Sequence, residues 1–380
     1  MAKFIIVSVF GLIIGIVAGI LIINSESAIP FHIKTPAPKQ VIGFLPYWQL
    51  DKANQNEEKY LTTLTYFALN VDGNGNVVKL INEQQEEPGW YELHSDKLRS
   101  IIENAKKNNI KLSLLISSGD ANAINQLVEK PTQHANTLIN DVAPIMKQYH
   151  FTDLNLDIED TTPASGSAQA HFTQFIKIVK QLLAKEKLGT LTLEISSADT
   201  VKYNLINISG IEPYADDIVL MAYDFHSPDS VVTGPVAPLN GAGKDSEYDV
   251  TTAVERTLQN VPPNKLLLGM PLYGYEWETL NTAVRSAVIP GSGVIASNNR
   301  AEALLSECAS CSAFFDNESA EAFAEYSDPT TGTYHQISFP DQQSIHAKLV
   351  FANKESLAGL ALWALGYEGN TILSPLANYK

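Results

Sequence analysis

The sequence contains few cysteines and few basic residues. Cysteine occurs only twice in 380 residues, which excludes a fold held together by many disulfides. Lysine and arginine number 26 against 42 aspartate and glutamate residues, which gives a net charge of -16. Because nucleic-acid backbones are bound by clustered basic side chains, this balance argues against a nucleic-acid partner.

Several common catalytic motifs are also missing. No GxGxxG or GxxxxGK[ST] sequence opens a helix, which argues against a dinucleotide- or nucleotide-binding loop. The eight histidines show no HExxH spacing and no GxSxG is present, which argues against metalloproteases and serine hydrolases. We therefore expect no cofactor and no metal ion, and nothing in the sequence indicates an obligate protein partner.

A long apolar run stands near the N-terminus. Residues 4–23, FIIVSVFGLIIGIVAGILII, carry no charge and match the roughly 20 residues of a membrane-spanning helix. We expect residues 1–23 to be a membrane anchor, with a cleavable signal peptide as the alternative, and the proline-containing residues 24–39 to be an extended linker. Lys3 is the only charge before the run, which favours a catalytic domain outside the cytoplasm, either anchored or secreted.

From residue 40 onward, short apolar runs alternate with helical patterns, which is typical of repeated βα units. Eight such repeats predict one α/β domain at 40–380, a closed (β/α)8 TIM barrel. The eight predicted strands are 41–47, 64–70, 111–117, 151–159, 190–196, 217–223, 265–273 and 357–365.

The connection between the seventh and eighth strands is too long for a simple loop. Residues 277–338 contain a helical piece and a hairpin pattern with a DPTTG turn, which predicts a small α+β insertion at the rim of the active site. The two cysteines, Cys308 and Cys311, lie in this insertion. Outside the cytoplasm they could form a local disulfide, whereas a zinc site would need a second pair of ligands.

Polar and aliphatic residues alternate along the predicted strand 151–159. Since successive side chains of a strand point to opposite faces, the polar ones share the face that points into the barrel. These are Asp153, Asn155, Asp157 and Glu159. A buried carboxylate without a partner is costly, which favours a functional site over a structural ion-pair cluster, and no basic residue on neighbouring strands is an obvious partner.

The segment FTDLNLDIE resembles the DxxDxDxE strand of glycoside hydrolase family 18, the chitinases and their relatives. Glu159 matches the catalytic acid and Asp157 the aspartate that contacts the substrate acetamido group. Asn155 replaces the middle aspartate and Thr152 the first. The Asn variant resembles a branch that includes bacterial spore-cortex and peptidoglycan N-acetylglucosaminidases.

Five further segments agree with the family in their order along the chain. They are LISSGD (115–120), MAYDF (221–225), GPVAPLN (234–240), LLGMPLYGYEW (267–277) and LALWAL (360–365). The resemblance implies a glycosidase that cleaves β-1,4-linked N-acetylglucosamine polymers, either chitin or peptidoglycan glycan, by substrate-assisted retention. It also implies that Tyr223 donates a hydrogen bond to the acetamido oxygen and that Asp224 binds the same sugar or orients its neighbours.

The predicted substrate-binding residues are mostly aromatic. All four tryptophans fall near predicted strand ends or in the loop after the second strand, where a barrel has its catalytic face. Trp363 matches the floor of the family's reactive-sugar subsite, and for two others, Trp48 and Trp90, rim packing is an equal alternative. The full predicted set is Trp363, Asn155, Met221, Tyr47, Phe67, Tyr273, Trp48, Trp90 and Trp277.

Two other functions compete with this hypothesis. A non-catalytic, chitinase-like carbohydrate-binding barrel keeps the cleft but typically loses the acid, whereas Glu159 and Asp157 are both present here. A barrel with unrelated chemistry is the second alternative, because a fold does not dictate a function. No other motif in the sequence supports it.

Overall fold

The computed structural model describes residues 38–379 except 53–56, 161–163, 245–247 and 309–310. The predicted anchor at 1–23 and nearly all of the linker at 24–39 lie outside the described residues. Among the residues that are described, no helix is both long and apolar enough to cross a membrane.

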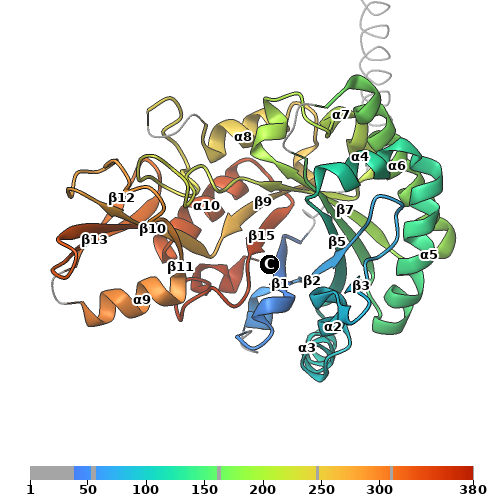
Figure 1. The fold of residues 1–380 in the computed structure, drawn as a ribbon, viewed down its shortest axis with the longest axis horizontal. Coiled ribbons are helices and arrows are strands. Elements are labelled where there is room, and N and C mark those ends of the chain that lie inside the picture. The colour runs from blue at the N-terminus through green and yellow to red at the C-terminus, as the bar shows by residue number, and fades with distance from the viewer. Residues whose placement is uncertain (1–37, 53–56, 161–163, 245–247, 309–310, 380) are drawn as a thin grey trace, which may run out of the picture. The chain divides into compact units, whose positions relative to one another are not determined.

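Eight parallel strands close into a barrel in the order β1-β15-β9-β8-β7-β6-β5-β2 (Figure 1). Each of them overlaps one of the eight predicted strands, so the expected barrel is confirmed. The strands are β1 Gln40–Pro46, β2 Thr63–Asn70, β5 Lys111–Ser118, β6 Asp153–Ile158, β7 Thr190–Ser196, β8 Asp217–Met221, β9 Leu266–Pro271 and β15 Gly359–Trp363.

Helices cover the outside of the barrel (Figure 1). Several begin at a side chain that caps the first turn; Ser165, for example, accepts a hydrogen bond from the Ala168 N–H and starts the longest one. The helices are α2 Pro88–Leu93, α3 Asp96–Lys107, α4 Ala121–Glu129, α5 Pro131–Tyr149, α6 Gly166–Glu186, α7 Ile208–Ile211, α8 Val250–Thr257 and α10 Gln342–Lys354. A short 3-10 helix, Ser374–Asn378, follows the last strand.

Alternation along the strands separates two hydrophobic layers. Leu154, Leu156 and Ile158 of β6 belong to the large core between the strands and the surrounding helices. A smaller apolar cluster forms a separate group on the opposite faces of the strands, and it includes Leu115, Val219 and Leu267. The polar residues of β6 therefore point into the barrel, as the sequence pattern predicts.

The long connection after β9 folds into a separate antiparallel sheet with the order β11-β10-β14-β13-β12. It begins at Tyr273 rather than at 277, because β10 follows β9 after a single residue. A disulfide joins Cys308 to Cys311 between α9 and β12. The elements are β10 Tyr273–Thr279, β11 Val294–Ser297, α9 Asn298–Glu307, β12 Ser312–Asp316, β13 Glu321–Asp328 and β14 Thr333–Phe339. A two-stranded ribbon, β3 Leu80–Asn82 with β4 Gln85–Glu86, follows β2.

One fully buried carboxylate fixes this insertion to the barrel. Glu321 of β13 accepts hydrogen bonds from the backbone N–H groups of Val236 and Ala237, at 2.8 and 2.7 Å, in the loop that follows β8. It also accepts from Ser338 on β14 at 3.1 Å, and Lys348 of α10 lies 3.3 Å away. Burial lowers the pKa of Lys348, while the charge of Glu321 opposes that shift.

The Lys348–Glu321 pair yields a first prediction. Lys348→Met keeps the apolar stem but leaves a buried carboxylate without its cation, which should lower the free energy of unfolding by about 3 kcal/mol. Urea unfolding measures this difference. Lys354→Met, at an exposed position of the same helix, is the matched control and should change stability by less than about 0.5 kcal/mol. Equal stability of the two variants would show that the buried pair does not hold the insertion in place.

Candidate active site

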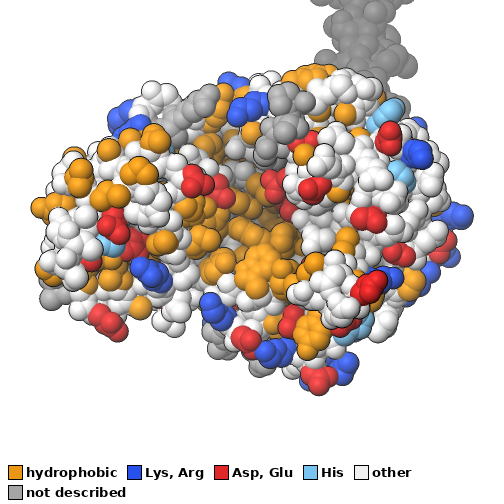
Figure 2. Space-filling view, viewed as in Figure 1, with side chains coloured by type: hydrophobic (Ala, Val, Ile, Leu, Met, Phe, Trp, Pro, Cys, Tyr) orange, Lys and Arg blue, Asp and Glu red, His pale blue; other side chains and the backbone are white. Residues whose placement is uncertain are grey.

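A cavity of about 400 Å³ opens at the carboxyl ends of the barrel strands. Figure 2 shows a hollow in the face of the molecule, with hydrophobic side chains gathered on its floor and acidic side chains beside them. Its walls come from the ends of seven barrel strands or the residues just after them. They are Phe44, Phe67, Leu115, Asp157, Glu159, Glu194, Ser196, Ser197, Ala198, Met221, Tyr223, Asp224 and Trp363.

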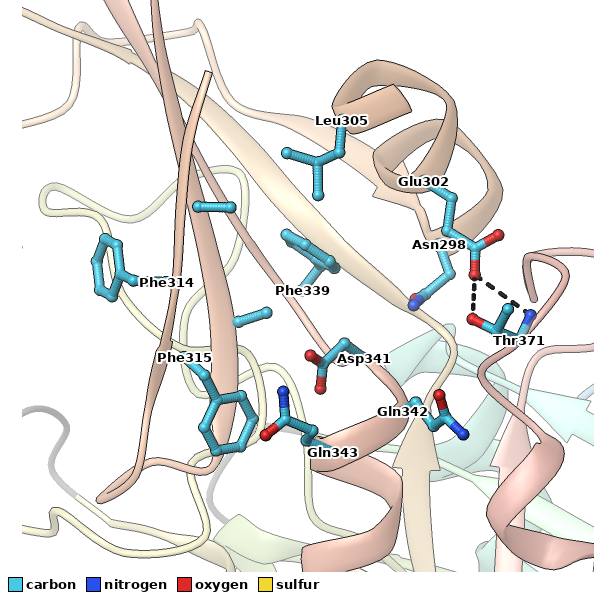
Figure 3. A pocket seen from close by; sticks show the side chains of 12 residues that line it. Asn298, Glu302, Leu305, Phe314, Phe315, Phe339, Asp341, Gln342, Gln343 and Thr371 are labelled. Carbon is cyan, nitrogen blue, oxygen red and sulfur yellow. Dashed lines mark hydrogen bonds between the residues drawn. The ribbon is translucent and has the colours of Figure 1, made fainter. Parts of the chain in front are cut away.

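A second cavity, of about 410 Å³, lies between the insertion and the start of α10 (Figure 3). Its acidic groups are occupied by structural hydrogen bonds. Glu302 accepts from the Asn370 N–H and from Thr371, and Asp341 accepts from the Ser344 N–H as the N-terminal cap of α10. The barrel cavity, where acids face open space, is therefore the candidate active site.

Asp157 and Glu159 form a carboxyl pair at the end of β6. Asp157 is buried, whereas Glu159 reaches into the open cavity and its backbone N–H donates to the Ser118 carbonyl at 3.0 Å. The side-chain interaction between the two carboxyl groups raises the pKa of Asp157 and lowers that of Glu159.

The surroundings of Asp157 and Glu159 favour the protonated form of these carboxyl groups. Burial is the largest cause that raises the pKa of Asp157, and the negative charge of Glu159 raises it further. Partial desolvation likewise raises the pKa of Glu159; its side-chain interaction with Asp157 opposes this shift, and the charges of Asp199 and Asp224 add to it. Asp157 Oδ1 is buried and has no hydrogen-bond partner within the described part of the chain. The arrangement can therefore deliver a proton to a group bound in the cavity.

Asp153 occupies the other end of the same strand and has a different role. It accepts hydrogen bonds from the hydroxyl groups of Ser113 and Thr190, both at 2.6 Å, and of Thr192 at 3.1 Å. Burial raises its pKa to about 7, although these three bonds oppose the shift. It does not line the cavity, so its function is structural.

The residues that follow β8 complete one wall. Tyr223 lines the cavity. Its ring packs close to Gly269, where an added Cβ would lie only 3.1 Å from Tyr223 Cε1, so the glycine leaves room for the ring. Asp224 has a φ of 59°, in the left-handed region that few non-glycine residues adopt. Its Oδ1 accepts hydrogen bonds from Tyr273 at 2.6 Å and Tyr275 at 2.7 Å, which hold the carboxylate in place.

Aromatic rings form the opposite wall. The rings of Phe67 and Trp363 have centroids 4.5 Å apart, and Phe44 packs edge-on against Trp363 at 6.0 Å. Trp48 continues this surface outward, 5.7 Å from Phe67 and 6.3 Å from Trp363, and remains 46% exposed. Such a wall suits the apolar faces of sugar rings.

Several predicted substrate-binding residues do not line the cavity. Trp277 is 0% exposed and donates its indole N–H to the Ser227 carbonyl, so the prediction that it contacts sugar is wrong. Tyr273 is also buried and orients Asp224 instead. Asn155 is 0% exposed and lies beneath the cavity.

Tyr47 and Trp90 are packing residues in this structure. Tyr47 packs edge-on against Trp48 at 4.8 Å, and Trp90 packs against His94 at 4.7 Å under the ammonium group of Lys79. Neither lines the cavity, whereas Trp363, Met221 and Phe67 do.

Two residues of the candidate site escaped the sequence analysis. Glu194 lines the cavity from β7, and Tyr275 donates to Asp224. The signal for Glu194 was a single charged residue inside an otherwise uncharged strand, TLTLEIS. The signal for Tyr275 was its spacing of two from Tyr273, which places both rings on one face of β10.

Comparison with known proteins identifies relatives of this chain. The family described as "Glycosyl hydrolases family 18" matches residues 40–368. The "Cortical fragment-lytic enzyme" of Bacillus subtilis (strain 168) is 26% identical over 354 residues, covering 87% of this chain and 73% of the relative. The "Class V chitinase" of Arabidopsis thaliana is 25% identical, covering 78% and 80%.

A solved structure has the same fold. The mutant class V chitinase of Nicotiana tobaccum in complex with NAG4 has a TM-score of 0.73 and 20% identity, over 89% of this chain and 97% of that one. Within the described part of this chain, no group of three or more His, Cys, Asp or Glu side chains is arranged to hold a metal ion.

The raised pKa of Asp157 predicts a pH-dependent cost to folding. As the pH rises above 3.8, the ordinary pKa of an aspartate, the unfolded chain releases this proton while the folded protein retains it, so stability falls until the folded pKa is passed. Asp157→Asn should therefore stabilise the fold at pH 8 and have little effect near pH 4. Thermal unfolding at both pH values measures this, with Asp51→Asn, at an exposed site, as the control. An equal shift at both pH values would contradict it.

Proposed function

The chain belongs to glycosyl hydrolases family 18, and on this basis we propose that it cleaves β-1,4-linked N-acetylglucosamine polymers by substrate-assisted retention, with Glu159 as the general acid and base. The observation that carries the proposal is a pair of carboxyl groups with raised pKa values that lines a cavity walled by aromatic rings. A carbohydrate-binding barrel without activity would not need a proton held there.

In the first step, Glu159 gives its proton to the glycosidic oxygen while the acetamido carbonyl oxygen of the same sugar attacks C1. The bond between C1 and the glycosidic oxygen breaks, the leaving chain keeps the proton, and an oxazolinium ion forms. In the second step, the Glu159 carboxylate takes a proton from a water molecule, whose oxygen attacks C1 and restores the acetamide. The anomeric configuration is retained.

The other cavity groups fit the charges that develop in these steps. Asp157, left with the negative charge once the proton sits on Glu159, faces the positive charge of the oxazolinium ion. The Tyr223 hydroxyl donates to the acetamido oxygen and aligns it for attack. Asp224, held by two tyrosines, binds a hydroxyl group of the same sugar.

Two features favour the glycan strands of peptidoglycan over chitin as the substrate. Asn155 replaces the middle aspartate of the strand motif, as in the spore-cortex branch that the sequence resembles. The apolar run at residues 4–23 would tether the enzyme to a membrane, with its barrel outside the cytoplasm and within reach of the cell wall. One curated relative is called a cortical fragment-lytic enzyme, and another a class V chitinase.

Product analysis tests this proposal. Residues 40–380 should release reducing N-acetylglucosamine ends from chitooligosaccharides and from purified peptidoglycan, with the larger kcat/KM on peptidoglycan. Faster cleavage of chitooligosaccharides would indicate that chitin, and not peptidoglycan, is the preferred substrate. Cleavage of neither polymer would contradict the proposed function.

The assignment of Glu159 yields a direct prediction. Glu159→Gln keeps the shape of the side chain but has no proton to transfer, so kcat should fall by at least about 1,000-fold. Folding and oligosaccharide binding, measured by thermal unfolding and calorimetry, should stay close to wild type. Glu302→Gln, in the cavity beside α10, is the matched control and should retain full activity. Turnover by Glu159→Gln at a rate near wild type would place the acid elsewhere.

A further inference from the structure

Glu194 lies beside the carboxyl pair on the neighbouring strand. In the register of β6 and β7, Asn155 pairs with Thr192 and Leu156 with Leu193, which brings Glu194 level with Asp157. Adjacent strands are about 4.8 Å apart, so two inward side chains at the same level are immediate neighbours. Glu194 is 5% exposed and lines the cavity.

Glu194 accepts a hydrogen bond from Asn155, the residue at which the strand motif departs from the family pattern. Asn155 Nδ2 donates to Glu194 Oε1 at 2.8 Å. The family motif has an acid at position 155, and here an amide occupies it and donates to a carboxyl group on the neighbouring strand β7. The pair of positions 155 and 194 therefore still contains one acid, displaced by one strand.

The groups that face Glu194 are acids, a phenol and an amide. From β6 these are Asp153, Asn155, Asp157 and the adjoining Glu159, and from the end of β8 it is Tyr223. The register partner of Glu194 on β8 is the apolar Val219. Among the described residues that line the cavity there is no Lys, Arg or His. Burial and the charge of Asp157 raise the pKa of Glu194 well above its ordinary value.

We propose that Glu194 is a positioning residue of this active site. It supplies from β7 the acid that position 155 lacks. It also keeps a proton on the pair of carboxyl groups, Asp157 and Glu159, at neutral pH. The inference rests on the proposed function. Three acids this close cannot all be ionised without a cation, so a negative charge on any one of them makes loss of a proton from the others harder. Glu194 thereby extends the pH range in which Glu159 retains a proton to donate.

Glu194→Gln tests this inference. The amide oxygen of glutamine can still accept the hydrogen bond from Asn155, so the change removes the acid and keeps the packing. The alkaline limb of the pH profile of kcat/KM should move to lower pH by about one unit, with KM unchanged at the optimum. Asp217→Asn is the control, because it removes a partly buried acid with a raised pKa from the start of β8, outside the cavity, and should leave the limb in place.

A reciprocal change makes the test specific. In Asn155→Asp/Glu194→Gln the acid returns to β6, and the alkaline limb should return to the position it has in wild type. Asn155→Asp alone places two acids in contact and should lower stability at neutral pH. An alkaline limb that Glu194→Gln leaves unmoved would overturn the proposal, and so would a double variant whose limb stays as low as that of the single variant. If Glu194→Gln does not fold, the double variant is compared with wild type: an alkaline limb at the wild-type position supports the proposal, and a limb at lower pH overturns it.

A readout that needs no substrate separates this inference from the proposed function. Infrared titration follows the carbonyl band of the protonated Glu159 carboxyl group, identified by its absence from Glu159→Gln, and this band should persist to higher pH in wild type than in Glu194→Gln. Identical titrations would overturn the role of Glu194 even in an active enzyme. A clear difference in a protein that cleaves neither polymer would support it and contradict the proposed function alone.

Discussion

Carboxyl groups that are buried without a basic partner are the constraint on which the rest of this site depends. Burial disfavours the charged form of an acid, and each ionised neighbour adds to that cost. On the inner side of β6 and β7, burial raises the pKa values of Asp157, Glu159 and Glu194, which favours the protonated forms of these acids.

The buried acids differ in the number of hydrogen-bond donors that surround them. Where a carboxylate has a structural role, it receives a full set of donors: Asp153 has three hydroxyl groups, and Glu321 has two backbone N–H groups, a hydroxyl group and Lys348. Among the described residues, by contrast, Asp157 Oδ1 has no hydrogen-bond partner. An acid left unsatisfied among well-satisfied ones is the expected signature of a group whose partner is a substrate.

Much of the fold and part of the site could be predicted from the sequence. Eight apolar runs located the barrel strands, and alternation along residues 151–159 placed Asp157 and Glu159 on the inner face, because these are local properties of a strand. The role of Trp277 could not be predicted in this way. It follows the predicted strand 265–273 in the sequence, but in the structure it lies inside β10 and is buried in a cluster with Val236 and Tyr273.

The hydrogen-bond partners of the site acids also could not be predicted from the sequence. Glu194 meets Asn155 through the register of two strands 39 residues apart, and Tyr275 reaches Asp224 across 51 residues. Register and packing between distant segments determine such contacts, and no local pattern specifies them. Sequence reasoning therefore located the candidate acids more readily than the groups that surround them.

The central claim is that the substrate's own acetamide, and no protein carboxylate, attacks the sugar. It is tested most directly by the thiazoline analogue of the oxazolinium intermediate together with mass spectrometry after exposure to a fluorinated glycoside. The account predicts competitive inhibition by the thiazoline and no covalent adduct on the protein. A glycosyl group trapped on Asp157, with no inhibition by the thiazoline, would contradict it.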